Sequence, residues 1–289
     1  HKGTCGHQWL AFNVVRCHDR DCVYHSGCTE RRTDMSVLKS FVIAFAMYSR
    51  IPVPQFEWKE RDMRYVICFF PFVGVVIGAV TLLWAYVCAH FSVGKPAFTL
   101  VGCAIPLLIS GGIHVDGFMD TMDAFHSYRE REEKLQILKD AHIGAFSVIC
   151  LVTYGLLFVG AYSELTVRKQ IFLLACGYYL ARILSGLGVV TLRCAKKDGL
   201  LYLFANRAHK IAVRTALAVQ LIACGAMMIL FGGWMGAAVL FGAVLTFFYY
   251  RHAAYRELGG ITGDTAGYFL TLCEGVMVVL LAVCGWIGV

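Results

Sequence analysis

Three aspartates stand at helical spacing within residues 111–126. Asp116, Asp120 and Asp123 are separated by four and three residues, so a helix places them on one stripe. Three carboxylates so close together repel one another unless a cation neutralises them. Magnesium binds one or two protein carboxylates together with the phosphate oxygens of a substrate. The stripe therefore predicts a Mg²⁺ site for a phosphorylated ligand, with these three aspartates as metal ligands and catalytic candidates.

A purely structural interpretation competes with this one, in which the acids form the solvated face of a loop helix. Their partners would then be the cations that follow, Arg129, Arg131 and Lys134. Against this, the stripe adjoins an apolar run and has no base within its own turns. Gly111, Gly112 and Gly117 also let a ligand or another segment approach closely. An acid placed at a bilayer is costly unless it is used, so we favour a functional site.

Charged residues continue along the same loop to the next apolar run. Cations that face a carboxylate-bound metal suit a diphosphate, because negative charge builds on phosphoryl oxygens in the transition state. We expect Lys139 and Asp140, just before the next span, to act in catalysis. Arg129 and His142 are candidate substrate-binding residues.

Arg131 and Lys134 fit a plainer role in the same loop. Glu130 and Lys134 are four residues apart, which is the spacing of a helical ion pair. We therefore expect these residues on an exposed helix.

A second polar segment, residues 259–267, is rich in glycine and contains Asp264. Glycines at this density leave backbone amides free to wrap an anion, and Asp264 is placed to complete a metal shell or orient a nucleophile. We take Gly263 as substrate-binding and Asp264 as catalytic. A short polar turn between spans is an alternative that the segment alone does not exclude.

Two ionisable residues, Arg182 and Glu274, lie inside apolar runs. An ionisable side chain inside a membrane has an unfavourable free energy, so such residues are by default functional or paired. They either pair with each other across helices or serve the floor of a pocket, and both interpretations stay open. We include Arg182 among the substrate-binding candidates, together with His114, two residues before the aspartate stripe.

The composition decides what kind of scaffold positions these residues. Of 289 residues, 58% are hydrophobic and 16% are charged, whereas a soluble domain is nearer one half and one quarter. The apolar residues come in long runs, which indicates an all-α, polytopic membrane bundle and excludes a soluble enzyme, a disordered chain, collagen and a coiled coil. The formal net charge of +7 reflects basic residues between these runs, so we expect lipid around the protein and no nucleic-acid partner.

Seven segments are long and apolar enough to be transmembrane helices. They are Tyr65–Phe91, Ala97–Ile113, Ile143–Tyr162, Ile171–Leu192, Ile211–Phe231, Trp234–Tyr250 and Tyr268–Val289. Gly232 and Gly233 predict a tight hairpin between the fifth and the sixth. Val37–Tyr48 is apolar but too short to cross, and Pro52 and Pro54 follow it, so we expect a helix that lies at the interface or is partly inserted.

The connections alternate strongly in charge. Those after Val37–Tyr48 and after the second, fourth and sixth spans carry clusters of Lys and Arg, whereas the other set carries Lys95, Arg168 and Lys169. By the positive-inside tendency the basic set is cytoplasmic. Every polar cluster described above belongs to that set, so we expect the site to face the cytoplasm.

Residues 1–34 differ from the rest of the chain. They contain four of the 13 cysteines and four histidines, but the spacing does not match a zinc motif. The chain begins with His1, and Met35 resembles a natural start, so we interpret residues 1–34 as an unrelated extension and 35–289 as the membrane-embedded domain. No secretory signal pattern is seen. The other nine cysteines lie in or beside apolar runs, where cysteine behaves as a small hydrophobe.

Three separated motifs resemble one known family. They are FAMYSRIPVPQ at residues 45–55, GGIHVDGFMDTMDAF continuing through REREEKLQILKDAHIGAFSV up to residue 148, and GGITGDTAGY at residues 259–268. In this order they are similar to the signature of the cobalamin synthase family, the adenosylcobinamide-GDP ribazoletransferases of bacteria and archaea. The resemblance covers residues 35–289; residues 1–34 lie outside it.

The resemblance implies a prokaryotic inner-membrane transferase that completes the nucleotide loop of vitamin B12. In that family α-ribazole, or its 5′-phosphate, attacks the diphosphate of adenosylcobinamide-GDP, and GMP leaves with magnesium assistance. It implies that Asp116, Asp120 and Asp123 form the metal and phosphate site, with Lys139, Asp140 and Asp264 nearby. Which aspartate is the base, and whether the chain self-associates, stay open.

Two other functions remain as alternatives. A CDP-alcohol phosphotransferase also places aspartates and Mg²⁺ at a membrane surface, but the second aspartate pair of its signature is missing here. A transporter would use carboxylates near the bilayer midplane, often with broken helices in two repeated halves. The sequence suggests neither feature.

Overall fold

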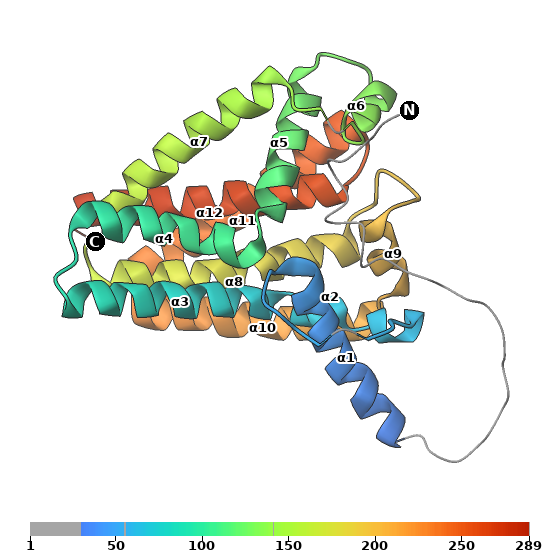
Figure 1. Cartoon of the computed structure of the whole chain (residues 1–289), viewed down its shortest axis with the longest axis horizontal. Coiled ribbons are helices and arrows are strands. Elements are labelled where there is room, and N and C mark those ends of the chain that lie inside the picture. The colour runs from blue at the N-terminus through green and yellow to red at the C-terminus, as the bar shows by residue number, and fades with distance from the viewer. Residues whose placement is uncertain (1–29, 55, 141, 289) are drawn as a thin grey trace, which may run out of the picture.

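Apolar segments of this length become helices because a bilayer leaves backbone amides and carbonyls no partners except those within the helix. The computed structural model describes residues 30–54, 56–140 and 142–288, and this part of the chain forms helices and one isolated β-bridge. In chain order the elements are α1 Glu30–Tyr48, the 3₁₀ helix Glu60–Met63, α2 Val66–Phe69, α3 Pro71–His90, α4 Lys95–Ser110, α5 Ile113–His126, α6 Arg131–Ile137, α7 Ala145–Ser163, α8 Arg168–Thr191, α9 Leu200–Arg207, α10 Lys210–Gly232, α11 Trp234–Leu258 and α12 Gly263–Trp286 (Figure 1).

The predicted membrane-spanning architecture is confirmed. Among the described residues, six helical segments are long and apolar enough to cross a membrane, and a seventh results if α4 and α5 together count as one bent span. The apolar part of α1, Val37–Tyr48, is too short to cross, as expected. In Figure 1, α3, α4, α8, α10 and α12 run roughly side by side, whereas α5 leaves the end of α4 in a different direction and passes the beginning of α12.

Helix α8 forms the centre of the bundle. Its most apolar stretch is 89% buried inside the protein, whereas that of α7 is only 17% buried and faces outward. Gly74 and Gly78 of α3 lie four residues apart against the backbone of α8 at Tyr178 and Ala175. Small residues at this spacing let two membrane helices approach closely.

The second predicted span, Ala97–Ile113, is interrupted in the structure. Helix α4 ends at Ser110, and α5 leaves it at an angle of 91°. Gly111 and Gly112 join them with φ values of 70° and 80°, a left-handed conformation that other residues rarely adopt. The prediction of a continuous helix from Ala97 to Ile113 is therefore wrong at its end, and the break directs the aspartate stripe toward the beginning of α12.

Other boundaries differ by several residues. The first predicted span is split at Phe70 into α2 and α3, where Pro71 begins the longer helix. The last predicted span begins at Tyr268, whereas α12 already begins at Gly263, so about half of the glycine-rich segment is helical. The predicted hairpin is confirmed, since Gly232 ends α10 and Gly233 has a φ of 57°.

The predicted extension, residues 1–34, lies mostly outside the described residues, including its cysteines and histidines. Helix α1 runs through the expected boundary at Met35. The nine other cysteines are all free.

Candidate active site

The aspartate stripe lies on α5, where the sequence spacing predicted it. Asp116 is exposed, whereas Asp120 and Asp123 are half-buried. Helix α5 follows the left-handed Gly111–Gly112 turn and lies over the beginning of α12. The stripe therefore belongs to the end of the bundle and not to its apolar middle.

Two glycines bring α5 and α12 together. A Cβ atom on Gly117 would lie 2.7 Å from the carbonyl oxygen of Asp264, and one on Gly267 would lie 3.0 Å from that of His114. Any larger side chain would push these helices apart. The close approach places Asp264, in the first turn of α12, beside the aspartates of α5.

Asp120 shows the electrostatic result of this packing. Partial burial raises its pKa to about 7, and the negative charges of Asp116, Asp264 and Asp123 contribute in the same direction. A carboxyl group near such neighbours binds a proton or a cation more readily than an isolated one. The cluster therefore carries uncompensated negative charge, which a bound cation can neutralise.

Asp123 has a different environment from the other two aspartates. Its carboxylate accepts hydrogen bonds from the backbone amides of Gly144, at 2.7 Å, and Ser147, at 2.9 Å. These amides belong to the beginning of α7, which the side chain caps from a distant part of the sequence. Among the described residues, no three His, Cys, Asp or Glu side chains already form a metal-binding group. Metal binding by the stripe stays a prediction.

The segment after α8 forms a wall opposite α5. It is joined to the glycine-rich segment by two backbone bonds, from Ile261 to the Arg193 carbonyl at 2.9 Å and from Ala195 to the Ile261 carbonyl at 2.8 Å. The Arg193 side chain also donates to the Gly259 carbonyl. This pairing holds Lys196 close enough to Asp264 for their charges to interact. Lys196 is half-buried, and burial lowers its pKa.

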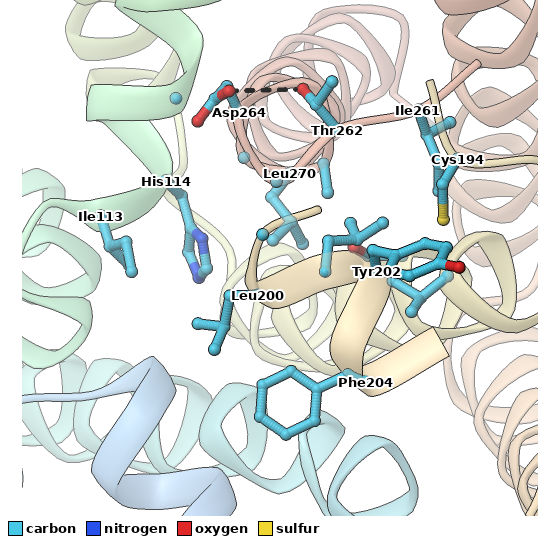
Figure 2. A pocket seen from close by; sticks show the side chains of 18 of the residues that line it. Ile113, His114, Cys194, Leu200, Tyr202, Phe204, Ile261, Thr262, Asp264 and Leu270 are labelled. Carbon is cyan, nitrogen blue, oxygen red and sulfur yellow. Dashed lines mark hydrogen bonds between the residues drawn. The ribbon is translucent and has the colours of Figure 1, made fainter. Parts of the chain in front are cut away.

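A cavity of about 340 Å³ lies between these elements. Asp116, Lys196, Asp198, Thr262 and Asp264 supply polar groups. The rest of the lining is largely apolar and includes Tyr48, Ile67, Phe70, Ile113, Val189, Leu200, Leu201, Tyr202, Phe204 and Leu270. Figure 2 shows Asp264 and Thr262 on one side of this space and Phe204 on the other.

The first turn of α12 contributes to the polar side. The Thr262 hydroxyl accepts from the Thr265 amide at 3.2 Å, and the Thr265 hydroxyl accepts from the Thr262 amide at 2.8 Å. Gly263, the first residue of α12, is exposed and lines the cavity. The positive end of the helix dipole therefore faces the cavity, as suits a phosphate group.

Several predicted residues lie outside the cavity lining. Arg129 is exposed and pairs with Glu133 at 3.4 Å. Asp140 is exposed, and its carboxylate lies 2.6 Å from His142 Nδ1. Lys139 does not line the cavity itself but lies 3.4 Å from Asp198, which does.

Arg182 and Glu274 form an ion pair at 2.7 Å within the bundle, which confirms one of the two predicted interpretations. Arg182 also donates to the Tyr178 carbonyl at 2.8 Å. The pair lines a second cavity of about 140 Å³, not the first. His114 lines both cavities.

The expectation of Lys134 on an exposed helix is wrong. Lys134 is buried and forms a 2.5 Å ion pair with Glu257 of α11. Arg131 lies next to Gly259, since a Cβ atom added to Gly259 would lie 2.8 Å from the guanidinium of Arg131. Helix α6 is thereby fixed to the end of α11, just before the glycine-rich segment.

Sequence reasoning missed Lys196, Asp198 and the aromatic residues of α9. Lys196 and Asp198 belong to a short charged run, KKD, directly before Gly199. In the sequence this run indicated only membrane sidedness. The pairing of this segment with Ile261 gives it a place in the site, and no sequence spacing reports that contact.

Comparison with known proteins identifies the family of this chain. The family model described as cobalamin-5-phosphate synthase matches residues 40–283. An adenosylcobinamide-GDP ribazoletransferase of Lachnoclostridium phytofermentans is 44% identical over 240 residues, covering 83% of this chain and 92% of that protein. Proteins of the same name from Clostridium perfringens and Listeria monocytogenes are each 30% identical, over 246 and 237 residues, and cover 85% and 80% of this chain and 98% and 92% of their own lengths. No solved structure matches. The chain belongs to the cobalamin-5-phosphate synthase family.

Proposed function

We propose that this protein transfers the adenosylcobinamide-phosphate group of adenosylcobinamide-GDP to α-ribazole or its 5′-phosphate, releasing GMP. The names of its relatives support this activity. The structural observation that carries it is the meeting of Asp116, Asp264 and Lys196 at one cavity, beside Asp120. This arrangement combines acids for a cation with a lysine and a helix N-terminus for phosphate.

The reaction exchanges one phosphorus–oxygen bond for another. A ribose hydroxyl attacks the phosphorus that carries the cobinamide, and the bond to the bridging oxygen of the diphosphate breaks, so that GMP leaves with that oxygen. We assign the role of proton acceptor for the attacking hydroxyl to Asp264, because its carboxylate lines the cavity. Lys196 and the amides at the beginning of α12 stabilise the charge on the phosphoryl oxygens.

The residues fit a magnesium ion. Asp116 and Asp120 are one helical turn apart and lie near Asp264, and their mutual repulsion is relieved when a cation binds. Magnesium commonly takes one or two carboxylates and completes its shell with water and substrate phosphates, so no complete protein shell is needed. When bound, the ion supplies charge stabilisation for the departing GMP. Asp123, which caps α7, is a weaker candidate ligand because its oxygens already accept two amides.

We further propose that the protein lies in the inner membrane of a prokaryote with this cavity facing the cytoplasm. The basic connections, including residues 193–197, belong to the cavity end of the bundle, and the opposite connections carry few Lys or Arg residues. Water-soluble nucleotides would then reach the site directly.

The comparisons give no support to the two alternatives. A transporter also conflicts with the position of the carboxylates, which lie near Asp264 in the first turn of α12 and not near the middle of that helix. The one broken span, α4 and α5, has no second broken pair in the described residues.

The test is an assay of the purified protein in nanodiscs. With Mg²⁺, adenosylcobinamide-GDP and α-ribazole, we expect GMP and the cobalamin product in equal amounts. Omission of α-ribazole or addition of EDTA should stop both. GMP formed without an acceptor would indicate hydrolysis, and no GMP under any condition would refute the proposal.

A further inference from the structure

The main cavity has a polar end and an apolar end. Along α12, Asp264 lies at the polar end and Leu270 lines the wall six residues further into the helix, about 9 Å away at the rise of an α-helix. Ile67 of α2, Phe70 directly after it and Ser185 of α8 also line the cavity. A ligand that fills it must therefore be polar at one end and largely apolar at the other.

His114 lies at the deeper level. Its carbonyl oxygen accepts a hydrogen bond from the Thr271 hydroxyl at 3.1 Å, one residue beyond Leu270. The residue is 9% exposed, and its ring packs edge-on against Phe70, with ring centroids 6.1 Å apart. Figure 2 shows the imidazole projecting from α5 between Ile113 and Leu200 into the space of the cavity.

The Nε2 atom of His114 is buried and has no hydrogen-bond partner. A buried polar atom without a partner is unfavourable, and such atoms are rare unless a ligand or water supplies the partner. Together with the Ser185 hydroxyl, this atom gives the apolar end of the cavity few hydrogen-bonding positions among its aliphatic and aromatic side chains. In the tautomer with its proton on Nε2, His114 can donate one hydrogen bond to an acceptor on a ligand.

The substrates of the proposed reaction offer three groups for this space. The corrin ring with its amide side chains is several times larger than a nucleoside and does not suit a cavity of about 340 Å³. Guanine carries several donors and acceptors that an apolar wall leaves unpaired. Dimethylbenzimidazole has an apolar ring, two methyl groups and one free ring nitrogen, which is an acceptor.

We propose, resting on the transferase function above, that this cavity is the α-ribazole subsite and that His114 selects the base by donating a hydrogen bond to its free ring nitrogen. The ring lies among Phe70, Phe204 and Leu201. The ribose then points toward Asp116 and Asp264, so that its hydroxyl meets the diphosphate at the polar end. The corrinoid stays outside the cavity, with only its diphosphate reaching in.

The test compares two acceptors that differ by one atom. α-Ribazole is set against the riboside of dimethylindole, in which a CH replaces the free ring nitrogen, at saturating adenosylcobinamide-GDP. Wild-type protein should prefer α-ribazole by about tenfold in kcat/KM, the effect of one hydrogen bond. In His114→Phe this preference should disappear, while the KM for adenosylcobinamide-GDP stays within about twofold.

A matched pair of variants guards against a folding defect in His114→Phe. Leu201 and Leu203 are both half-buried on α9, but only Leu201 is among the residues lining the cavity. Leu201→Ala should raise the KM for α-ribazole several-fold, and Leu203→Ala should leave it unchanged. Neither variant should alter the KM for adenosylcobinamide-GDP.

The outcomes separate this inference from the proposed function. An active wild type that accepts both ribosides equally, or variants that change the KM for adenosylcobinamide-GDP and not that for α-ribazole, would overturn the subsite while leaving the transferase intact. A wild type that makes no GMP with α-ribazole would refute the function itself.

Discussion

Two groups of charges on α12 have opposite characters. Asp264, in the first turn, joins Asp116 and Asp120 of α5, where acids outnumber nearby cations. Glu274, ten residues further along, is paired with Arg182 at 2.7 Å inside the bundle. The first group needs a partner from outside the chain, whereas the second has its partner within it.

This difference separates function from structure. A buried ion pair with both charges present needs no counterion from outside, so its loss should be felt in folding. A set of crowded carboxylates is incomplete, and its loss should be felt in ligand binding. From the sequence alone, the charges of both groups are energetically unfavourable at a membrane. Only the neighbouring side chains in the structure distinguish the two groups.

The largest effect on activity should come from the incomplete group. Asp120→Asn keeps the shape of the side chain but removes a negative charge, so it should lower kcat/KM for GMP release by at least about 10²-fold. Its thermal stability should equal or exceed that of the wild type, because repulsion within the cluster falls. An active Asp120→Asn protein would contradict the metal assignment.

The complete pair should show the reverse behaviour. Glu274→Gln leaves the Arg182 charge buried without a counterion and should destabilise the protein by about 3–5 kcal/mol, measured by unfolding in mixed micelles. The double variant Arg182→Met with Glu274→Leu should recover most of this loss and keep catalysis. If the double variant folds well but loses all activity, the pair has a chemical role that this comparison denies.

The pH dependence of Mg²⁺ activation gives a further test of Asp120. The pKa of Asp120 is raised from an ordinary value of 3.8 to about 7, so below pH 7 the carboxyl must release a proton before a cation binds. The Mg²⁺ concentration for half-maximal activity should rise by about tenfold for each pH unit below 7 and level off above it. Activity measured against Mg²⁺ at several pH values checks this, and a midpoint independent of pH would argue against Asp120 as a ligand.

The same shift predicts a change in stability without metal. The folded protein holds the Asp120 proton more tightly than the unfolded chain, so this group stabilises the fold at low pH and loses that contribution as the pH rises from about 3.8 to about 7. Mg²⁺ should restore the loss, which thermal unfolding at pH 8 with and without the ion would show.

A smaller effect on activity is expected when the charge of Lys196, which lines the cavity, is removed. Lys196→Gln should raise the KM for adenosylcobinamide-GDP by about tenfold, because a charge-assisted hydrogen bond to phosphate is lost. Lys197→Gln is the matched control, since Lys197 is exposed and is not among the cavity-lining residues. Equal effects of the two would mean that general positive charge, and not the position of Lys196, attracts the substrate.

The smallest effect should come from the third aspartate of the stripe. Asp123 caps α7, so Asp123→Ala should cost about 1 kcal/mol of stability, and in the fraction that remains folded the activity should fall much less than in Asp120→Asn. Unfolding and activity measured on the same preparation separate the two roles. A loss of activity as large as that of Asp120→Asn would make Asp123 a metal ligand after all.

Local patterns predicted much of this molecule. Long apolar runs indicated the spans, and the four- and three-residue spacing placed Asp116, Asp120 and Asp123 on one helix. Contacts between distant segments were not predictable in this way. Lys134 was predicted on an exposed helix because its partner, Glu257, is 123 residues away in the sequence. The cap on α7 likewise joins residues 21 apart.

The break after Ser110 shows the same limit. An apolar run continues through Ile113, so hydropathy extends the span across Gly111 and Gly112. The left-handed conformation of both glycines, which hydropathy does not report, ends the helix there and sets the direction of α5. That direction, more than the stripe itself, is what brings the carboxylates to Asp264.

The most direct test of the central claim places Mn²⁺ in the position proposed for Mg²⁺ and measures its coupling to phosphorus. In the presence of adenosylcobinamide-GDP, pulsed electron–nuclear double resonance should show strong ³¹P coupling in the wild type and in the Arg182→Met, Glu274→Leu double variant. The coupling should vanish when Asp116 and Asp120 are both changed to Asn. Coupling that survives the loss of both aspartates would contradict the assignment of the site to α5 and α12.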